Sequence, residues 1–278
     1  MDNKPADKKC WMVQLIPQSG LGSDPLECGR WRIRRSGHTT YKDGDTPLCS
    51  LARKWGTDKA DNNYTKVYYE LFKNIQNETL SIFEIGIFRG ASLAMWREFF
   101  PNALVVGMDN CGIEEWPIVT MQHYFQELVN NRKGLFEVYV GDQNDRHAFS
   151  SLYQGLYEKY PGFESYGIII DDGIHRQRPQ QFSLGILWDQ LANGGFYIIE
   201  DVMDRRSHDG DCEWGSSDDA WTIDVFKDWK ETGKLSSPYI HKSVSDRMTL
   251  ECDPDSIRIV KCTDTTSVII LQKNVPEG

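Results

Sequence analysis

The sequence predicts a three-layer α/β/α fold, in which a doubly wound, mostly parallel seven-stranded sheet ends in an antiparallel hairpin. Three observations support this prediction. Short apolar runs alternate with amphipathic stretches through the middle of the chain, and unbroken runs are typical of strands covered on both faces. Several of these runs lead directly into acidic residues. Two further runs near the C-terminus are separated by a short polar turn, which favours a hairpin at the sheet edge.

The chain, at 278 residues, is long enough for one large domain with an appendage. We assign residues 1–45 to an N-terminal extension, because glycine, proline and charge interrupt every periodic pattern there. The main domain, residues 46–278, begins with a helical cap over about residues 46–78. Two expected helices, 47–55 and 67–75, flank the polar loop 56–64. The composition of this loop favours an ordinary surface position, although its place before the first strand also allows it to fold over a crevice.

Strands and helices then alternate, which predicts a sheet with helices on both faces. The expected parallel strands cover residues 80–86, 103–109, 136–142, 168–170 and 196–199. The expected helices cover residues 91–100, part of 117–131, 146–159, the crossover between the fourth and fifth strands, and 220–230. The terminal hairpin pairs residues 256–262 with residues 267–273.

The fourth and fifth strands both run into acidic pairs. Asp171 and Asp172 follow one strand, Glu200 and Asp201 follow the other, and His175 lies three residues beyond Asp172. A crossover helix brings both strand ends to the same edge of the sheet, where open α/β sheets bind ligands. Singly, either aspartate could cap the next helix, the second pair could face solvent, and the histidine could be structural. Their convergence favours a divalent-metal site with a general base beside it.

The first strand ends in a turn that suits a nucleoside cofactor. Glu84, Gly86, Gly90 and Ser92 give the spacing ExGxxxGxS, in which the glycines allow a tight turn and a close approach to a ligand. The pyrophosphate-binding pattern GxGxxG is missing, which weakens a nicotinamide or flavin interpretation and favours a cofactor without phosphate.

Acidic residues also end the second and third strands. Asp109 stands about 20 residues after the glycines, where an acid can accept hydrogen bonds from ribose hydroxyls. Asp142 and Gln143 are placed to meet an adenine edge. Each acid alone is more often a helix cap or turn former. Acids at successive strand ends, together with the glycine turn, favour nucleoside binding.

Composition excludes several classes of function. The chain carries 41 acidic and 31 basic residues and a formal charge of −10, which does not suit a surface for nucleic acid or anionic lipid. No run approaches the length of a transmembrane helix, and the N-terminus lacks the apolar stretch of a secretory signal. The 7 cysteines are scattered without CxxC pairs, so we expect no disulfide framework or zinc site and a reducing, cytoplasmic location.

Four segments carry a resemblance to a known family. They are GTDK at residues 56–59, EIGIFRGAS at 84–92, DDGIH at 171–175 and IIEDV at 198–202. With them the sequence resembles class I S-adenosylmethionine-dependent methyltransferases, and more narrowly the metal-dependent sugar O-methyltransferases of the macrocin and mycinamicin group. The resemblance covers about residues 51–204. Relatives often carry a histidine shortly before the tyrosine that follows GTDK, where this chain has Asn62 and Asn63.

This resemblance implies a cofactor, a metal and a set of roles. S-adenosylmethionine would be the methyl donor, and Mg²⁺ or another hard divalent cation would be held by Asp172, Glu200 and Asp201. His175 would be the catalytic base, acting with Asp172, and Thr57 and Lys59 would contribute to cofactor binding. The acceptor would be a sugar-containing small molecule or a glycan. The family also implies a homo-oligomer.

The leading hypothesis is therefore methyl transfer to a sugar hydroxyl, with metal and base acting on the same oxygen. An alternative keeps the cofactor but takes a catechol, a polyketide or another small hydroxylated metabolite. A nicotinamide-dependent enzyme and a non-catalytic nucleoside-binding domain are further alternatives. Residues 204–219, with Trp214 as a candidate for sugar stacking, either line the acceptor pocket or form a surface loop.

Overall fold

A computed structural model describes residues 44–88, 90–110, 135–203 and 220–276. Three of the sequence predictions lie outside these residues: nearly all of the N-terminal extension, the helix within 117–131, and the loop 204–219 with Trp214. In the described part of the chain, no helix combines the length and the apolar character needed to cross a membrane.

The seven strands form one sheet in the order β3-β2-β1-β4-β5-β7-β6. The first five strands pair in parallel, whereas β7 is antiparallel to both β5 and β6. The predicted fold class and the terminal hairpin are thus confirmed. The strands are β1 Ser81–Ile85, β2 Leu104–Asp109, β3 Leu135–Val140, β4 Tyr166–Asp171, β5 Leu191–Met203, β6 Arg258–Lys261 and β7 Thr266–Gln272.

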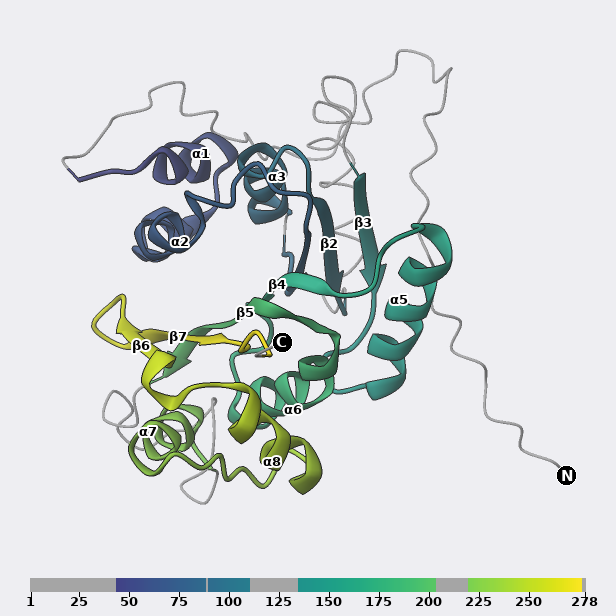
Figure 1. Cartoon of the computed structure of the whole chain (residues 1–278). Coiled ribbons are helices and arrows are strands. Elements are labelled where there is room, and N and C mark those ends of the chain that lie inside the picture. The colour runs from purple at the N-terminus through teal and green to yellow at the C-terminus, as the bar shows by residue number, and fades with distance from the viewer. Residues whose placement is uncertain (1–43, 89, 111–134, 204–219, 277–278) are drawn as a thin grey trace, which may run out of the picture.

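Helices cover both faces of the sheet (Figure 1). One face carries α1 Pro47–Trp55, α2 Tyr64–Phe72 and α3 Ala91–Phe99. The other carries α5 Arg146–Lys159, α6 Gln177–Leu187, α7 Thr222–Thr232 and α8 Lys242–Glu251. Short 3₁₀ turns are η1 Asp58–Ala60, η2 Trp188–Gln190 and η4 Pro254–Ser256.

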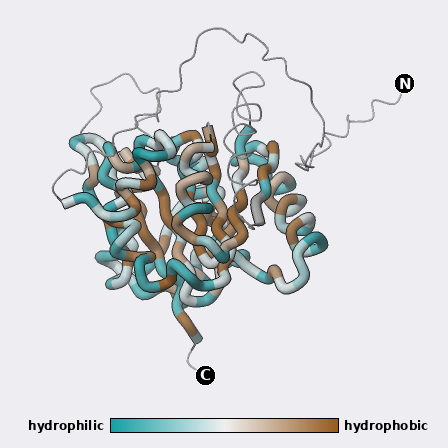
Figure 2. The backbone as a smooth tube through the Cα atoms, turned by 90° about the horizontal axis from the view of Figure 1, so that it is seen from above, coloured by the Kyte–Doolittle hydropathy of each residue, from teal (hydrophilic) through white to brown (hydrophobic). Residues whose placement is uncertain are grey.

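The alternation of side chains along the strands divides the core into two layers. In β1, Ile82 packs with the aromatic side chains of α2 and α3, whereas Phe83 and Ile85 pack with α5 and α6. Successive residues of a strand point to opposite faces, so a run of apolar residues fills both layers. Hydrophobic residues accordingly follow the central strands in the view from above (Figure 2).

Three elements differ clearly from the sequence prediction. Strand β5 extends beyond the predicted 196–199 at both ends, so the acidic pair expected after the strand lies within it. Helix α2 begins at Tyr64, three residues before the predicted start, because Asn63 adopts a left-handed conformation, with φ 62°, at its N-cap. Helix α8 was not predicted. In its sequence, KSVSDRMTLE, Ser245 and Met248 are the buried residues, so its apolar stripe is too narrow to stand out.

Candidate functional site

A cavity of about 590 Å³ opens at the carboxyl ends of β1 to β5. Its walls come from the turn after each of these strands and from the loop between α1 and α2. The order of the sheet reverses between β1 and β4, and open α/β sheets bind ligands at such a point. The cavity therefore lies at the predicted edge. Among the predicted site residues, those lining it are Thr57, Gly86, Ser92, Asp109, Asp142, Gln143, Asp172, His175, Glu200 and Asp201.

The turn after β1 is built around Gly86. This residue has φ 80°, and a Cβ added to it would lie 2.0 Å from the backbone oxygen of Asp172. A glycine is thus required both for the conformation and for the close approach of the β4 turn. Gly90, with φ 72°, is the N-cap of α3. Ser92 in the first turn of that helix donates a hydrogen bond of 2.8 Å to Glu84 Oε2.

Asp109 at the end of β2 supports this same turn. Its Oδ2 accepts hydrogen bonds from the backbone N–H groups of Ile87, at 2.9 Å, and Phe88, at 3.1 Å. The carboxylate also lines the cavity. The role of Asp109 toward a ribose stays a prediction, and the structure adds a role in shaping the turn.

The residues after β3 make mainly protein contacts. Asp142 Oδ1 accepts from the backbone N–H of Asn144 at 2.8 Å, as in an Asx-turn. Gln143 is buried, and its Nε2 donates to both carboxylate oxygens of Asp171 at 2.7 and 2.8 Å. Its Oε1 accepts from the backbone N–H of Ile174 at 3.0 Å. Gln143 thus fixes the turn after β4, and an adenine contact by either residue stays a prediction.

The two adjacent aspartates at the end of β4 have different surroundings. Asp171 is fully buried and accepts hydrogen bonds from Gln143, from the Ser183 hydroxyl and from the backbone N–H of Gly173. Burial raises the pKa of Asp171 to about 6, although these hydrogen bonds oppose the rise. Asp172 lines the cavity, and 23% of its side chain is exposed. The structure therefore makes Asp171 a structural acid and presents Asp172 to a ligand.

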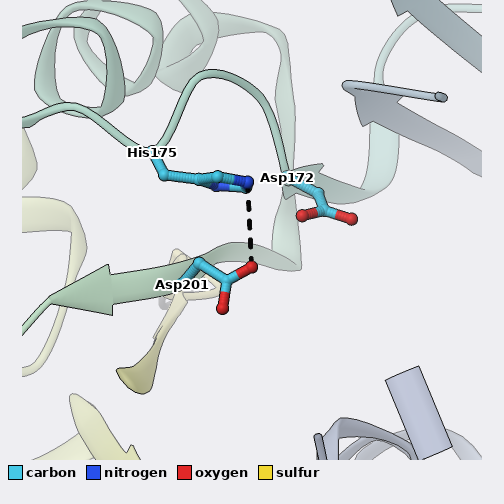
Figure 3. Close-up of side chains that lie close together, drawn as sticks. All are labelled: Asp172, His175 and Asp201. Carbon is cyan, nitrogen blue, oxygen red and sulfur yellow. Dashed lines mark ion pairs between the residues drawn. The ribbon is translucent and has the colours of Figure 1, made fainter. Parts of the chain in front are cut away.

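Asp172, His175 and Asp201 form a cavity-facing cluster (Figure 3). One potential ligand atom from each lies within 4.8 Å of the others, and His175 Nε2 lies 3.8 Å from Asp201 Oδ2. His175 and Asp201 both have left-handed backbones, with φ 55° and 49°. Such conformations cost on the order of 1 kcal/mol each and often mark functional sites. At Asp201 this coincides with an irregularity in the pairing of β5 and β7.

A second, buried acid cluster consists of Glu84, Asp172 and Glu200, and it surrounds the ammonium group of Lys59. Lys59 Nζ lies 2.7 Å from Asp172 Oδ2, 2.6 and 2.7 Å from the two Glu200 oxygens, and 3.1 Å from Glu84 Oε1. Asp172 thus belongs to both clusters. Lys59 is 1% exposed and does not line the cavity. The loop that was expected at the surface therefore enters the site, and cofactor contact by Lys59 stays a prediction.

Burial and the neighbouring charges strongly shift the pKa values of the acids in this cluster and of Lys59. Burial raises the pKa of Glu84 to about 7, against the opposing effect of Lys59. Burial and the neighbouring Asp172 raise the pKa of Glu200 well above its usual range. Burial lowers the pKa of Lys59, but the three carboxylates outweigh this effect and raise it well above its ordinary value.

Two tyrosines of α2 also reach the acidic pair in β5. Tyr64 donates its hydroxyl to Asp201 Oδ1 at 2.5 Å, and Tyr68, one turn later, donates to Glu200 Oε1 at 2.7 Å. The sequence analysis predicted neither hydrogen bond. Their i, i+4 spacing was the available signal, since it places two hydroxyls on one helix face.

The two asparagines that stand where relatives often have a histidine occupy different positions. Asn62 lines the cavity. Asn63 precedes α2 and donates a hydrogen bond of 3.1 Å to the backbone oxygen of Cys262, so it ties the helical cap to the terminal hairpin.

The predicted metal ligands all line the cavity, but they are not equivalent. Asp172 and Asp201 share the cavity-facing cluster with His175, whereas Glu200 lines the cavity while being held by Lys59 and Tyr68. Carboxylate oxygens are the ligands that Mg²⁺ prefers. The residues present therefore fit a hard divalent cation, and the assignment of the three ligands stays a prediction.

Comparisons with known proteins agree with the resemblance found in the sequence. No family model matches the chain. The demethylmacrocin O-methyltransferase of Streptomyces fradiae is 30% identical over 194 residues, which are 66% of this chain and 43% of that protein. The mycinamicin VI 2''-O-methyltransferase of Micromonospora griseorubida is 29% identical over 149 residues, which are 50% of this chain and 31% of that protein. The chain thus spans less than half of the length of these relatives.

Among solved structures, the MycE methyltransferase from the mycinamycin biosynthetic pathway, in complex with Mg, S-adenosylhomocysteine (SAH) and mycinamycin VI, superposes with a TM-score of 0.55. It is 20% identical, and the match covers 83% of this chain and 54% of that one. A second MycE structure, with Mg and SAH, gives a TM-score of 0.56 at 21% identity and covers 84% and 55% of the two chains. The class I methyltransferase fold and the resemblance to the macrocin and mycinamicin group are confirmed.

Proposed function

We propose that this chain is an S-adenosylmethionine- and Mg²⁺-dependent O-methyltransferase that acts on a sugar hydroxyl of a glycosylated small molecule. The observation that carries the proposal is one cavity with two chemically different parts to its lining. A glycine turn braced by Asp109 forms one part, and the cavity-facing cluster forms the other. The matching relatives are named as O-methyltransferases of macrolide compounds, so polyketide glycosides are the first acceptors to test.

The cofactor would lie along the ends of β1, β2 and β3. Gly86, Ser92 and Thr57 line the cavity and would contact it, with Gly90 as the N-cap of α3 and Glu84 bonded to Ser92. Asp109 would accept from the ribose, and Asp142 and Gln143 would lie beside the adenine. The missing pyrophosphate pattern fits a donor without phosphate.

Asp172, Glu200 and Asp201 would hold the cation. Once bound, a divalent ion polarises an acceptor hydroxyl and lowers the pKa of that hydroxyl. Tyr64 and Tyr68 orient the Asp201 and Glu200 carboxylates through the hydrogen bonds described above. Such fixed orientation is what makes a metal site tight and specific.

His175 would take the proton from the acceptor hydroxyl. Its side chain is 25% exposed and lines the cavity, and Asp201 lies beside its Nε2. A carboxylate near the ring can hold the imidazole in place and stabilise the cation that forms when it accepts a proton. An imidazole can accept a proton near neutral pH, which suits a general base.

The proposal is tested by calorimetry with S-adenosylmethionine against NAD, followed by a mass search for +CH₂ products among deoxysugar glycosides, with a catechol as the acceptor of the alternative hypothesis. EDTA should abolish transfer and Mg²⁺ should restore it. NAD binding without affinity for the sulfonium cofactor would overturn the proposal. A product from the catechol alone would favour the small-metabolite alternative.

Variants of two histidines test the base. His175→Ala should lower turnover by about 10²- to 10⁴-fold while SAH still binds. His241→Ala is the matched control, since His241 is the exposed N-cap of α8 and does not line the cavity. A loss of a few-fold in His175→Ala, with cofactor still bound, would reduce His175 to a positioning role.

A further inference from the structure

The local sequence around Lys59 directs its side chain inward. Gly56, with φ 77°, ends α1 and donates its backbone N–H to Ala52 O at 2.9 Å. Thr57 is the N-cap of η1, and its side chain accepts from the backbone N–H of Lys59. The short turn then places Lys59 against three strand ends, at Glu84 of β1, Asp172 after β4 and Glu200 of β5. The GTDK segment thus has a structural role. It ends α1, caps η1 and turns the Lys59 side chain toward the interior.

The ammonium group stands where a small cation would be expected. Glu84, Asp172 and Glu200 each offer a carboxylate oxygen within 4.8 Å of the others, and Lys59 Nζ contacts all three acids. Glu84 and Glu200 are almost fully buried. Buried carboxylates without a partner are very unfavourable, so a positive charge among these acids stabilises the fold.

The contacts also divide the acidic residues between Lys59 and the cavity-facing cluster. Lys59 bonds to both oxygens of Glu200 and to Oδ2 of Asp172, whereas Asp201 receives the hydroxyl of Tyr64 and faces His175. One ammonium group thus faces three acidic side chains. Asp172, the residue common to both clusters, connects the buried cation with the cavity.

We propose that Lys59 is a positioning residue that acts as a built-in cation. It neutralises part of the charge of Glu84, Asp172 and Glu200, so that the ends of β1, β4 and β5 assemble without metal and Asp172 and Asp201 remain presented to a divalent ion. The assignment of a divalent ion to the cavity rests on the proposed function. The role of Lys59 in the buried acid cluster rests on the ion pairs alone.

The test is thermal unfolding of Lys59→Met in EDTA and in excess MnCl₂, without cofactor or acceptor. The midpoint of Lys59→Met should fall by about 10 °C in EDTA, because two buried carboxylates and the partly exposed Asp172 lose their counter-charge. Mn²⁺ should recover much of this loss, since the three acids can then hold the metal ion. The stabilisation by Mn²⁺ should therefore exceed that of the wild type. A merely structural lysine would give no such rescue.

The matched control is Lys73→Met. Lys73 also forms an ion pair, at 2.5 Å with Glu70, but on the surface, where such a pair contributes little. Its midpoint and its response to Mn²⁺ should equal those of the wild type. The inference is overturned if Lys59→Met keeps the wild-type midpoint in EDTA, or if its loss is the same with and without Mn²⁺.

A double variant keeps the inference testable if Lys59→Met does not fold. Lys59→Met combined with Glu200→Gln removes one carboxylate charge together with the cation, so it should fold and be more stable than Lys59→Met alone. If the double variant is no more stable than Lys59→Met, the loss of stability does not come from the unbalanced charge of the acids, and the inference is overturned. Calorimetry of wild-type protein with SAH runs in parallel: absent SAH binding would remove the proposed function and leave the result on Lys59 standing.

Discussion

Replacement of Gly86 by alanine tests the packing that joins the two halves of the site. At φ 80°, the left-handed conformation costs an alanine roughly 1–2 kcal/mol. The new Cβ would also lie 2.0 Å from the Asp172 oxygen, 2.6 Å from its carbonyl carbon and 2.8 Å from Gly173 Cα. These are backbone atoms, which cannot rotate away, and overpacking of this kind costs typically about 1–3 kcal/mol more. We expect a loss of about 2–5 kcal/mol in the free energy of unfolding.

Gly233→Ala is the control for this experiment. Gly233 has a similar φ of 71°, but a Cβ there would meet nothing within 4 Å, and the residue ends α7 away from the cavity. This variant should lose only the conformational term of roughly 1–2 kcal/mol. Urea unfolding measures both losses, and SAH calorimetry should show weakened binding for Gly86→Ala alone. Equal losses for the two variants would refute the close contact between the β1 and β4 turns.

Three further predictions address individual side chains. Tyr64→Phe removes the hydrogen bond to Asp201 and should weaken Mn²⁺ binding by about tenfold, measured by calorimetry; unchanged affinity would show that Tyr64 does not orient this ligand. Asp171→Asn should lower the free energy of unfolding by about 1–3 kcal/mol, because one oxygen that accepts a hydrogen bond becomes a donor, and a neutral result in urea would contradict its structural role. Burial raises the pKa of Cys252 and Cys262 to about 11, so at pH 8 iodoacetamide should label them at least about 100-fold more slowly than a small free thiol, with a rate that rises with pH. Rapid labelling in peptide mapping would show that these thiols are accessible and ionised.

Much of the fold could be predicted because each element carries its own local signal. The bounds of α1 and α5 agree with the prediction, since a Pro near the start of α1 and an Asp cap before α5 mark their beginnings. The predicted start of α2 was wrong because the left-handed conformation of Asn63, which precedes the helix, could not be predicted from the local sequence. The narrow apolar stripe of α8 gave no usable periodicity.

The candidate site was predictable at the level of strand ends. Parallel strands bring their carboxyl ends together, so the position of Asp172, Glu200 and Asp201 followed from chain order. The different roles of Asp171 and Asp172 could be seen only in the structure, because they depend on which neighbouring side chain bonds to each carboxylate. Gln143 supplies this difference by occupying both oxygens of Asp171.

The role of Lys59 could not be derived from local patterns. Its partners Asp172 and Glu200 are 113 and 141 residues away in the sequence, so no periodicity links them. A lysine in a polar loop is usually exposed, which is why the loop was expected at the surface. Burial of this side chain follows from the meeting of three acidic strand ends, which is a property of the assembled fold.

The most direct test of the account is the anomalous diffraction of crystals grown with Mn²⁺ and SAH. We expect a single anomalous peak at the cavity, held by Asp172, Glu200 and Asp201 and next to His175, with Lys59 still paired to the buried acid cluster. A peak elsewhere on the molecule, or a cavity that binds SAH but no metal, would contradict the claim that these strand ends form a cation site.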